Sequence, residues 1–431
     1  MAPSAESPLR RQLLRTGALL TAGLGLPGVS RAGAAPVADL ADRLAPLLRG
    51  ADGGRQLAGA ALVVERASAP MAAGVVGQAA GLDASRRDDR PRPLTLHSKM
   101  RVASVSKMVV ALTAVRLAEA GVVSLDRDLR PTFPMLTHPA FPDAPLSLRH
   151  LLAHTSTIRD PLDEAYYAVS PARIESILGP HLMNPKARRP PGAWFEYCNL
   201  NFGLAATVME RAAKERFDVL ARTLVLEPAG LTGGFNWSAV AAADRRQGAT
   251  LYRRFDDGWR VQTDGPEVLS DSKPVGVVED TFAFADYAIG SNGTLFSPQG
   301  GLRINAFELA QLARLAGTEP ALQGVEWRLE TADGEEQNGD SWGGAFYEVG
   351  LGSYQWPAER SPIPGTRMIG HDGEAYGLYS GAWYLPELDA SIGFAVTGTP
   401  AGEQPAGGSH PGYNRWSQAM FDIAATVLAL R

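Results

Sequence analysis

The chain is poor in cysteine, in lysine and in long apolar runs. Its 431 residues include a single cysteine, Cys198, and only five lysines. One cysteine excludes an internal disulfide, so core packing must stabilise the fold, and a chain of this length can bury enough surface for that. The net charge of -5 provides no excess of positive charge for binding nucleic acid or an anionic membrane surface.

The first 35 residues have the pattern of an export signal. Arg10 and Arg11 precede a glycine-rich, mildly apolar stretch that ends near Val29, and the small residues 32–34 follow. Paired arginines, a short apolar segment and a small-residue cleavage site are typical of twin-arginine signal peptides. The apolar segment is shorter than the roughly 20 residues that cross a bilayer, so we expect no membrane span after signal removal. The pattern predicts an exported bacterial protein, periplasmic or secreted.

The hydrophobic pattern predicts strands at both ends of the sequence and helices between them. Apolar runs bounded by turn residues predict strands at 57–65, 71–81, 367–371, 379–386 and 390–399. Apolar residues at helical spacing predict helices at 36–50, 105–120, 146–155, 201–215, 305–317 and 414–430. Residues 232–297 are rich in Gly, Pro and Asp, and we expect long loops there.

This order of elements favours an α/β fold of the α+β type. Strands from the two ends would form one mostly antiparallel sheet, flanked by the N- and C-terminal helices. We expect residues 36–103 and 300–431 to form this sheet lobe. Residues 104–299 would form an inserted, mainly helical lobe with long loops. A cleft between the two lobes is then the expected binding site.

Ser104 and Lys107 stand three residues apart at the start of an apolar helix, and this pair suggests nucleophilic chemistry. At this spacing the two side chains share one face of the helix. A serine hydroxyl needs a group that removes its proton, and a lysine buried among apolar residues loses its charge easily. The alternative is an N-cap serine followed by a solvated lysine. The apolar residues 108–112 favour burial of the lysine, and therefore chemistry.

The same Ser-x-x-Lys pattern recurs at Ser270 and Lys273. Pro274 follows, in a polar sequence that is typical of a loop. Because no helix would organise this second pair, we interpret it as a coincidence.

Two further clusters carry side chains that could complete a catalytic site. Tyr197 and Asn199 precede an apolar helix. A tyrosine beside a cationic lysine can have a lowered pKa and act as a base, and an asparagine can bond both a lysine and a substrate amide. His371, Asp372 and Gly373 lie on a predicted strand. Taken singly, the first cluster also fits a turn beside a half-buried aromatic ring, and the second a strand-end histidine in a glycine-rich turn.

In this order, the three clusters resemble the serine β-lactamase and penicillin-binding-protein superfamily. The similarity is to the branch that holds class C β-lactamases, D-alanyl-D-alanine carboxypeptidases and family VIII esterases. The segments that carry it are "RVASVSK", "LSLRHLLAHTS", "PPGAWFEYCN", "FSPQGGLRINAFELAQL" and "GHDGEAYG". The resemblance implies a β-lactamase/transpeptidase-like fold with its active site in the cleft between the lobes.

The resemblance also implies roles for the first two clusters. Ser104 would be the acylated nucleophile, with Lys107 adjacent to it. Tyr197 would take the proton of Ser104 and later activate water, and Asn199 would orient Lys107 and the substrate amide. The implied reaction is acyl transfer to Ser104 followed by hydrolysis of an ester or amide, such as a D-Ala-type peptide, a carboxylic ester or a β-lactam. It needs no metal and no cofactor.

The third cluster would form the other wall of the cleft. His371, Asp372 and Gly373 would contact the substrate. The backbone N–H groups of Glu374 and Ser104 would form the oxyanion hole. The partner implied is a small-molecule or peptide substrate, with a peptidoglycan-derived peptide as one candidate.

Several positions depart from the family pattern. His371 stands where β-lactamases often have lysine, and Asp372 where they often have threonine. Glu374 adds a second acidic side chain beside the expected oxyanion hole, and the two would disfavour an anionic substrate. Thr157 stands where the family motif "HTSG" has glycine. Cys198 occupies the middle position of the Tyr-x-Asn motif, usually a small residue, and we interpret it as a residue that fills space in the core. These departures favour a peptidase or esterase over a true β-lactamase.

Three alternatives compete with this interpretation. His150 and His154 have a zinc-like spacing, but "HLLAH" lacks the glutamate of a metallohydrolase motif. An α/β-hydrolase is excluded because the chain has no G-x-S-x-G sequence. The remaining alternative is a catalytically silent, penicillin-binding-like module that binds peptidoglycan fragments or a protein partner.

Overall fold

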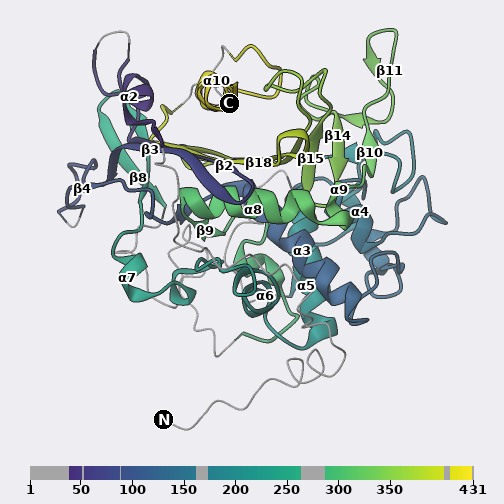
Figure 1. The fold of residues 1–431 in the computed structure, drawn as a ribbon. Coiled ribbons are helices and arrows are strands. Elements are labelled where there is room, and N and C mark those ends of the chain that lie inside the picture. The colour runs from purple at the N-terminus through teal and green to yellow at the C-terminus, as the bar shows by residue number, and fades with distance from the viewer. Residues whose placement is uncertain are drawn as a thin grey trace.

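A long sheet, built from both ends of the chain, organises the molecule (Figure 1). The computed structural model describes residues 38–50, 53–87, 89–161, 173–263, 287–401 and 408–429. In order across the sheet, the strands are β1 (Ala38–Asp39), β3 (Ala69–Ala80), β2 (Gly59–Arg66), β18 (Ala390–Thr397), β17 (Leu378–Leu385), β16 (Met368–Ala375), β15 (Ser353–Trp356), β14 (Glu348–Gly350) and β10 (Trp327–Arg328), with β4 (Arg92–Pro93) paired to β3. β1 is parallel to β3 and the other pairs are antiparallel. The prediction of a mostly antiparallel sheet is confirmed.

Helices cover both faces of this sheet. The C-terminal helix α10 (Arg415–Ala429) and the short α2 (Ala41–Leu44) lie on one face, and α8 (Ala306–Thr318) lies on the other (Figure 1). β17 and β18 are therefore buried along their whole length. Side chains alternate between the two layers, because Leu62 packs in the cluster with α10 while Val63 packs in the cluster with α8. Gly393 lets α8 approach, since a Cβ there would lie 2.4 Å from the backbone nitrogen of Ala310.

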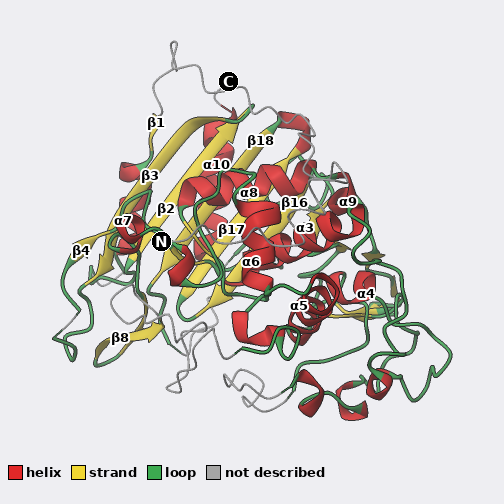
Figure 2. Cartoon of the chain, turned by 90° about the horizontal axis from the view of Figure 1, so that it is seen from below, coloured by secondary structure: helices red, strands yellow, loops and turns green. Residues whose placement is uncertain are grey.

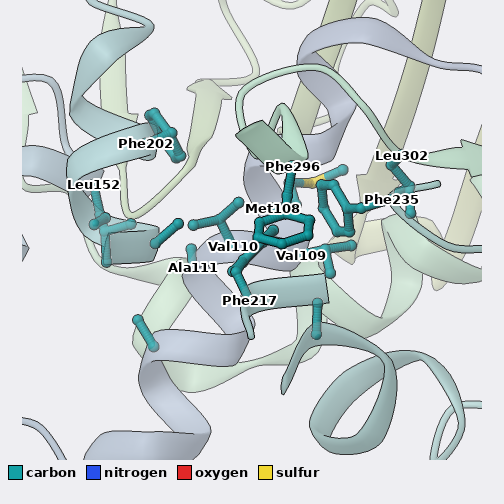
Figure 3. Close-up of a cluster of buried hydrophobic side chains, with 14 of the residues drawn as sticks. Met108, Val109, Val110, Ala111, Leu152, Phe202, Phe217, Phe235, Phe296 and Leu302 are labelled. Atoms are coloured by element: carbon teal, nitrogen blue, oxygen red, sulfur yellow. The ribbon is translucent and has the colours of Figure 1, made fainter. Parts of the chain in front are cut away.

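Further helices lie below α8 in Figure 1, on the side away from the sheet, and Figure 2 shows the molecule from that side. The longer ones are α3 (Ser106–Glu119) and α5 (Leu200–Ala213). The short helices α4 (Leu148–Leu152) and α6 (Phe217–Ala221) pack against them. Met108, Val109 and Val110 of α3 are fully buried among aromatic rings of the neighbouring segments (Figure 3). Burial of each such side chain contributes about 1.5–3 kcal/mol. The helix ends at Glu119, and Gly121 follows with a φ of 69°, the left-handed conformation that commonly terminates a helix.

A buried ion pair fixes the segment that leads into α3. The Lys99 ammonium donates to both carboxylate oxygens of Glu308, at 2.8 and 2.7 Å, and to the hydroxyl of Thr232. Glu308 also closes a capping box with Asn305 at the start of α8. The pair thus ties the chain just before Ser104 to the helix that packs on the sheet.

Short elements complete the architecture. They are β5 (Met100–Arg101) with β9 (Arg303–Ile304), β6 (Phe195–Glu196) with β13 (Gly339–Asp340), β11 (Thr331–Ala332) with β12 (Glu335–Glu336), the hairpin β7 (Leu251–Phe255) and β8 (Gly258–Thr263), α7 (Ala242–Arg245) and α9 (Pro320–Gln323). No helix among the described residues is long and apolar enough to cross a membrane.

Two local predictions need correction. The helix expected at 36–50 is instead β1, α2 and a 3₁₀ turn at Ala45–Leu48, because Pro46 lacks the N–H that a continuing helix would use. The segment expected as loops contains the β7–β8 hairpin, whose turn is the Asp256–Asp257 pair before Gly258. The export signal and the Ser270–Lys273 pair lie outside the described residues. The division into lobes at 103/104 and 299/300 stays a prediction.

Candidate active site

Ser104 lies in a tight 3₁₀ turn, Ala103–Val105, which leads directly into α3. Ala103 has a φ of 49°, a left-handed conformation that costs a residue with a Cβ about 1–2 kcal/mol. The hydroxyl of Ser106 holds the turn by donating to the Ala103 carbonyl at 2.6 Å and accepting the N–H of Leu302 at 3.0 Å. This turn places the Ser104 side chain at the wall of a cleft.

Lys107 is fully buried one turn below Ser104. Its ammonium donates to the Ser104 hydroxyl at 2.8 Å, to the Asn199 side-chain oxygen at 2.9 Å and to the Gln299 carbonyl at 2.9 Å. All three donor positions of the amine are therefore directed by the protein. The spacing argument from the sequence is confirmed, since the two side chains share one helix face and touch.

Burial lowers the pKa of Lys107 to about 7, because an ammonium group loses its hydration there. The negative charges of Asp160 and Asp372 act in the opposite direction and favour the charged form. At neutral pH a large fraction of the amine is thus uncharged. The 2.8 Å contact then allows the lysine nitrogen to accept the proton of the Ser104 hydroxyl.

Tyr197 brings a second hydroxyl to Ser104 from a distant part of the chain. Its phenol O–H donates to the Ser104 oxygen at 2.9 Å, and its ring stacks on His154 at 4.4 Å. The sequence led us to expect a lowered pKa for this tyrosine, and this expectation is wrong. Burial raises the pKa of Tyr197 above its usual value, and the negative charge of Asp372 raises it further. Tyr197 is thus arranged as a hydrogen-bond donor, and Lys107 is the more basic neighbour of Ser104.

Asp160, which sequence reasoning missed, fixes the orientation of Asn199. One carboxylate oxygen accepts the backbone N–H and the side-chain N–H of Asn199, both at 3.0 Å. The other accepts the N–H of Leu200 at 2.8 Å and the thiol of Cys198 at 3.3 Å. With its amide nitrogen held by Asp160, Asn199 turns its oxygen toward Lys107. The carboxylate also lies at the N-terminus of α5, where the helix dipole favours it.

Asp160→Asn should lower the turnover of an ester substrate about 10- to 100-fold, because the Asn199–Lys107 alignment loosens. Loss of the negative charge should also lower the pKa of Lys107 further. The acid limb of the kcat/KM profile should therefore move to lower pH. A pH–rate profile of both proteins measures this.

Cys198→Ser is the matched control, because it changes a neighbouring contact of Asp160 and leaves the carboxylate in place. It should retain most activity with an unshifted profile. Burial raises the pKa of the Cys198 thiol well above its usual value, so the thiol is a poor nucleophile. An inactive Cys198→Ser protein would reopen a catalytic role for the thiol, and an unshifted profile for Asp160→Asn would contradict the role of Asp160.

The opposite wall of the cleft is β16, and here one expectation needs correction. His371 is fully buried, packs on the Tyr354 ring at 4.1 Å and does not line the cleft. Burial holds the pKa of His371 well below its usual value, so the ring is neutral. Asp372 and Glu374 face the cleft instead, because successive strand residues point to opposite sides.

Gly373 permits close contact between β16 and the nucleophile turn. A Cβ at this position would lie 2.5 Å from the Val102 carbonyl oxygen and 3.1 Å from the Ala103 Cβ. Only a glycine lets the strand come this near. The cleft is lined by both Ser104 and Glu374, the two residues whose N–H groups would form the oxyanion hole according to the family resemblance.

The cleft itself has a volume of about 440 Å³. Acidic side chains, Asp372 and Glu374, and basic ones, Arg101 and Arg253, line it together. Aromatic side chains supply most of the rest of the wall, namely Tyr197, Trp342, Phe346, Tyr354, Tyr376 and Tyr413. Burial raises the pKa of Asp372 to about 7, and the nearby Glu374 charge also raises it. This cleft is large enough for a small substrate.

Two other positions clarify departures noted in the sequence. Thr157 has a φ of 65°, the left-handed conformation for which the related "HTSG" motif has glycine, so the substitution keeps the backbone shape at a cost in strain. The His154 ring accepts the N–H of Cys198 at 2.9 Å and supports Tyr197 by stacking. Within the described part of the chain, no three His, Cys, Asp or Glu side chains are grouped to hold a metal ion.

Comparisons with known proteins agree with this arrangement. The model of the Beta-lactamase family matches residues 41–409. The chain is 28% identical over 151 residues to penicillin-binding protein 4* of Bacillus subtilis (strain 168), an alignment that covers 32% of this chain and 31% of that protein. It is 27% identical over 150 residues to the D-alanyl-D-alanine-carboxypeptidase/endopeptidase AmpH of Escherichia coli (strain K12), covering 34% and 39%. The matched segments thus span about a third of these relatives.

A solved structure extends the similarity to the fold. The class C β-lactamase from Rhodobacter sphaeroides superposes with a TM-score of 0.58 at 16% identity, over 87% of this chain and 95% of that one. This establishes a shared architecture.

Proposed function

The chain belongs to the Beta-lactamase family, and from this premise we propose that it is a serine hydrolase that works through a covalent acyl-enzyme on Ser104. The observation that carries the proposal is the pair of hydrogen bonds that converge on one hydroxyl, from Lys107 at 2.8 Å and from Tyr197 at 2.9 Å. A structural serine has no need of a buried amine and a partly buried phenol on the same oxygen. The pair is what proton transfer during attack on a carbonyl requires.

The proposed reaction has two halves. In the first, Ser104 attacks the carbonyl carbon of an ester or amide while its proton passes to the neutral Lys107 amine. The tetrahedral oxyanion is held by the backbone N–H groups of Ser104 and Glu374, and the lysine proton then passes to the leaving oxygen or nitrogen. In the second half, water gives a proton to Lys107 and attacks the acyl-enzyme, which releases the acid and restores Ser104.

Tyr197 and Asn199 act in support. The Tyr197 hydroxyl donates to the Ser104 oxygen as negative charge develops on it. Asn199 accepts from Lys107 and keeps the amine pointed at the nucleophile. Asp372, Gly373 and Glu374 are proposed to border the bound substrate, and the His371 side chain to support the wall from behind.

A carboxylic ester or a peptide-like amide is the proposed substrate, in preference to a β-lactam. Asp372 and Glu374 face the cleft without a lysine or arginine within ion-pair distance among the described residues. The Glu374 charge and the ionised fraction of Asp372 oppose the carboxylate that β-lactams carry, and they offset the positive charge of Arg101 and Arg253 in the same cleft. A peptidoglycan-derived peptide remains a candidate substrate. We also propose that the protein is exported through the twin-arginine pattern at its N-terminus.

The substrate preference is tested with a panel of nitrocefin, a short-chain p-nitrophenyl ester and a peptide that ends in D-Ala. Ester turnover should be readily measured, and nitrocefin turnover slow or absent, for the electrostatic reason just given. Absorbance assays at equal enzyme concentration provide the comparison. Efficient nitrocefin hydrolysis would overturn the preference while leaving the acyl-enzyme mechanism standing.

Covalent labelling distinguishes the proposed hydrolase from the alternative, a catalytically silent binding module. A fluorophosphonate or a labelled penicillin should form an adduct on Ser104, located by peptide mass spectrometry. A folded protein that forms no adduct with either reagent would favour the binding module.

A further inference from the structure

Trp342 is an exposed aromatic side chain at the cleft that contains Ser104. It is 58% exposed, the largest value among the exposed large apolar side chains of the described residues. Its ring lies 5.3 Å from the Tyr197 ring and 5.1 Å from the Phe346 ring. The Trp342 ring thus lines the same cleft as Ser104 and Tyr197, where its exposed aromatic surface is available to a ligand.

The backbone holds Trp342 in a strained conformation. Its φ of 53° lies in the left-handed region, whereas the next two residues, Gly343 and Gly344, are glycines that adopt positive φ without strain. A glycine at 342 would relieve the backbone, yet the position carries the bulkiest side chain. Strain of this kind in a cleft indicates that the side chain is needed there.

Two hydrogen bonds fix the backbone of this loop. The Trp342 N–H donates to the Asp340 side chain at 3.0 Å, and the Ser341 N–H donates to Glu336 at 2.6 Å. Asp340 belongs to β13, which pairs with Phe195–Glu196, the strand that immediately precedes Tyr197. The backbone at Trp342 is therefore tied, through β13 and β6, to the segment that carries Tyr197.

We propose that Trp342 is a specificity-determining residue. With Phe346, Tyr376 and Tyr413, it forms an aromatic subsite that takes an aromatic ring of the substrate, next to the bond that is cleaved. This inference rests on the proposed function and deepens it. Aromatic side chains bind flat rings by stacking and edge-to-face contacts, and they bind puckered rings of equal size less well. The single methyl group of a D-alanine residue would leave the Trp342 ring uncovered.

The test uses matched substrates that differ only in ring shape. Methyl phenylacetate is compared with methyl cyclohexylacetate for a ring on the acyl side, and benzyl acetate with cyclohexylmethyl acetate for a ring on the leaving side. Methyl acetate is the reference without a ring. The wild-type protein should favour the aromatic member of at least one pair about tenfold in kcat/KM, mainly through KM.

Trp342→Ala should abolish this preference, lowering kcat/KM for the aromatic ester about tenfold more than for methyl acetate. Trp342→Phe should keep most of the preference, since it retains a flat ring. A preference that survives in Trp342→Ala, or that is absent in the wild type, would overturn the inference. Circular dichroism of both variants checks that each is folded.

Failure of the hydrolase proposal gives a different result. In that case no ester is turned over and Ser104 takes no label. Calorimetric binding of N-benzylphenylacetamide and its dicyclohexyl analogue to the Ser104→Ala protein, with and without Trp342→Ala, then measures the ring preference without turnover. Equal dissociation constants for the two amides would contradict the aromatic subsite.

Discussion

Ser104→Ala is expected to abolish acylation and to lower ester turnover at least about 10⁴-fold, the loss that follows removal of the nucleophile in serine hydrolases. The reason is structural. Lys107 and Tyr197 both direct their polar hydrogens at the Ser104 oxygen, and the variant removes that oxygen while leaving them in place. The residual rate should come only from substrate binding and the oxyanion donors.

The measurement combines initial rates on a p-nitrophenyl ester with intact-protein mass after fluorophosphonate treatment. The variant should gain no mass, whereas the wild type gains one adduct. Because Ser104 is partly exposed on a turn, the shortened side chain should leave thermal unfolding within a few degrees of the wild type. Turnover that persists in a folded Ser104→Ala protein would mean that the reaction uses another nucleophile.

Removal of the Lys107 amine is the second large effect that we expect. Lys107→Met should lower kcat/KM about 10³- to 10⁴-fold, since general-base assistance is worth up to that factor and methionine fills the buried space without accepting a proton. Lys107→Arg should fail as well, because a guanidinium keeps its charge and cannot act as a base.

The pH dependence distinguishes the lysine from the tyrosine as the base. The pKa of Lys107 lies at about 7, so the amine is protonated below pH 7 and neutral above it. Only the neutral amine can take the Ser104 proton. The wild-type kcat/KM should therefore fall about tenfold for each pH unit below 7 and level off above 8.

Tyr197→Phe provides the contrast. It removes a hydrogen-bond donor to the Ser104 oxygen, a contribution of about 10²-fold in rate, and should leave the acid limb near pH 7. If instead the acid limb disappears in Tyr197→Phe and persists in Lys107→Met, then tyrosine is the base and our assignment fails.

Local sequence predicted the elements that depend on neighbouring residues. The apolar run after Lys107 indicated a buried helix, and α3 is buried on nearly all sides. Apolar runs with turn residues at their ends located β2, β3, β17 and β18 within a few residues. Helical spacing put Ser104 and Lys107 on one face, and no tertiary information was needed for that.

Predictions from the sequence were wrong where they depended on which face of a strand a side chain occupies, or on the pKa of a group. On β16 the motif drew attention to His371, but the pleat turns its ring inward and presents Asp372. The pKa of Tyr197 was expected to fall beside a cation, and it rises. Desolvation depends on what surrounds a group in three dimensions. For Tyr197, the effect of burial on the pKa is larger than the effect of one neighbouring charge.

What the sequence by itself determined is the pairing of Ser104 with Lys107 one turn along and the family pattern of strands and helices, because periodicity and short spacings are local properties. Only the tertiary structure assigned Asp160 to Asn199 and brought Trp342 to within 5.3 Å of Tyr197. These partners are joined through space by β13 pairing with β6 and by the packing around α5. No local pattern encodes them, because each contact depends on how distant segments fold together and on the water that this folding excludes.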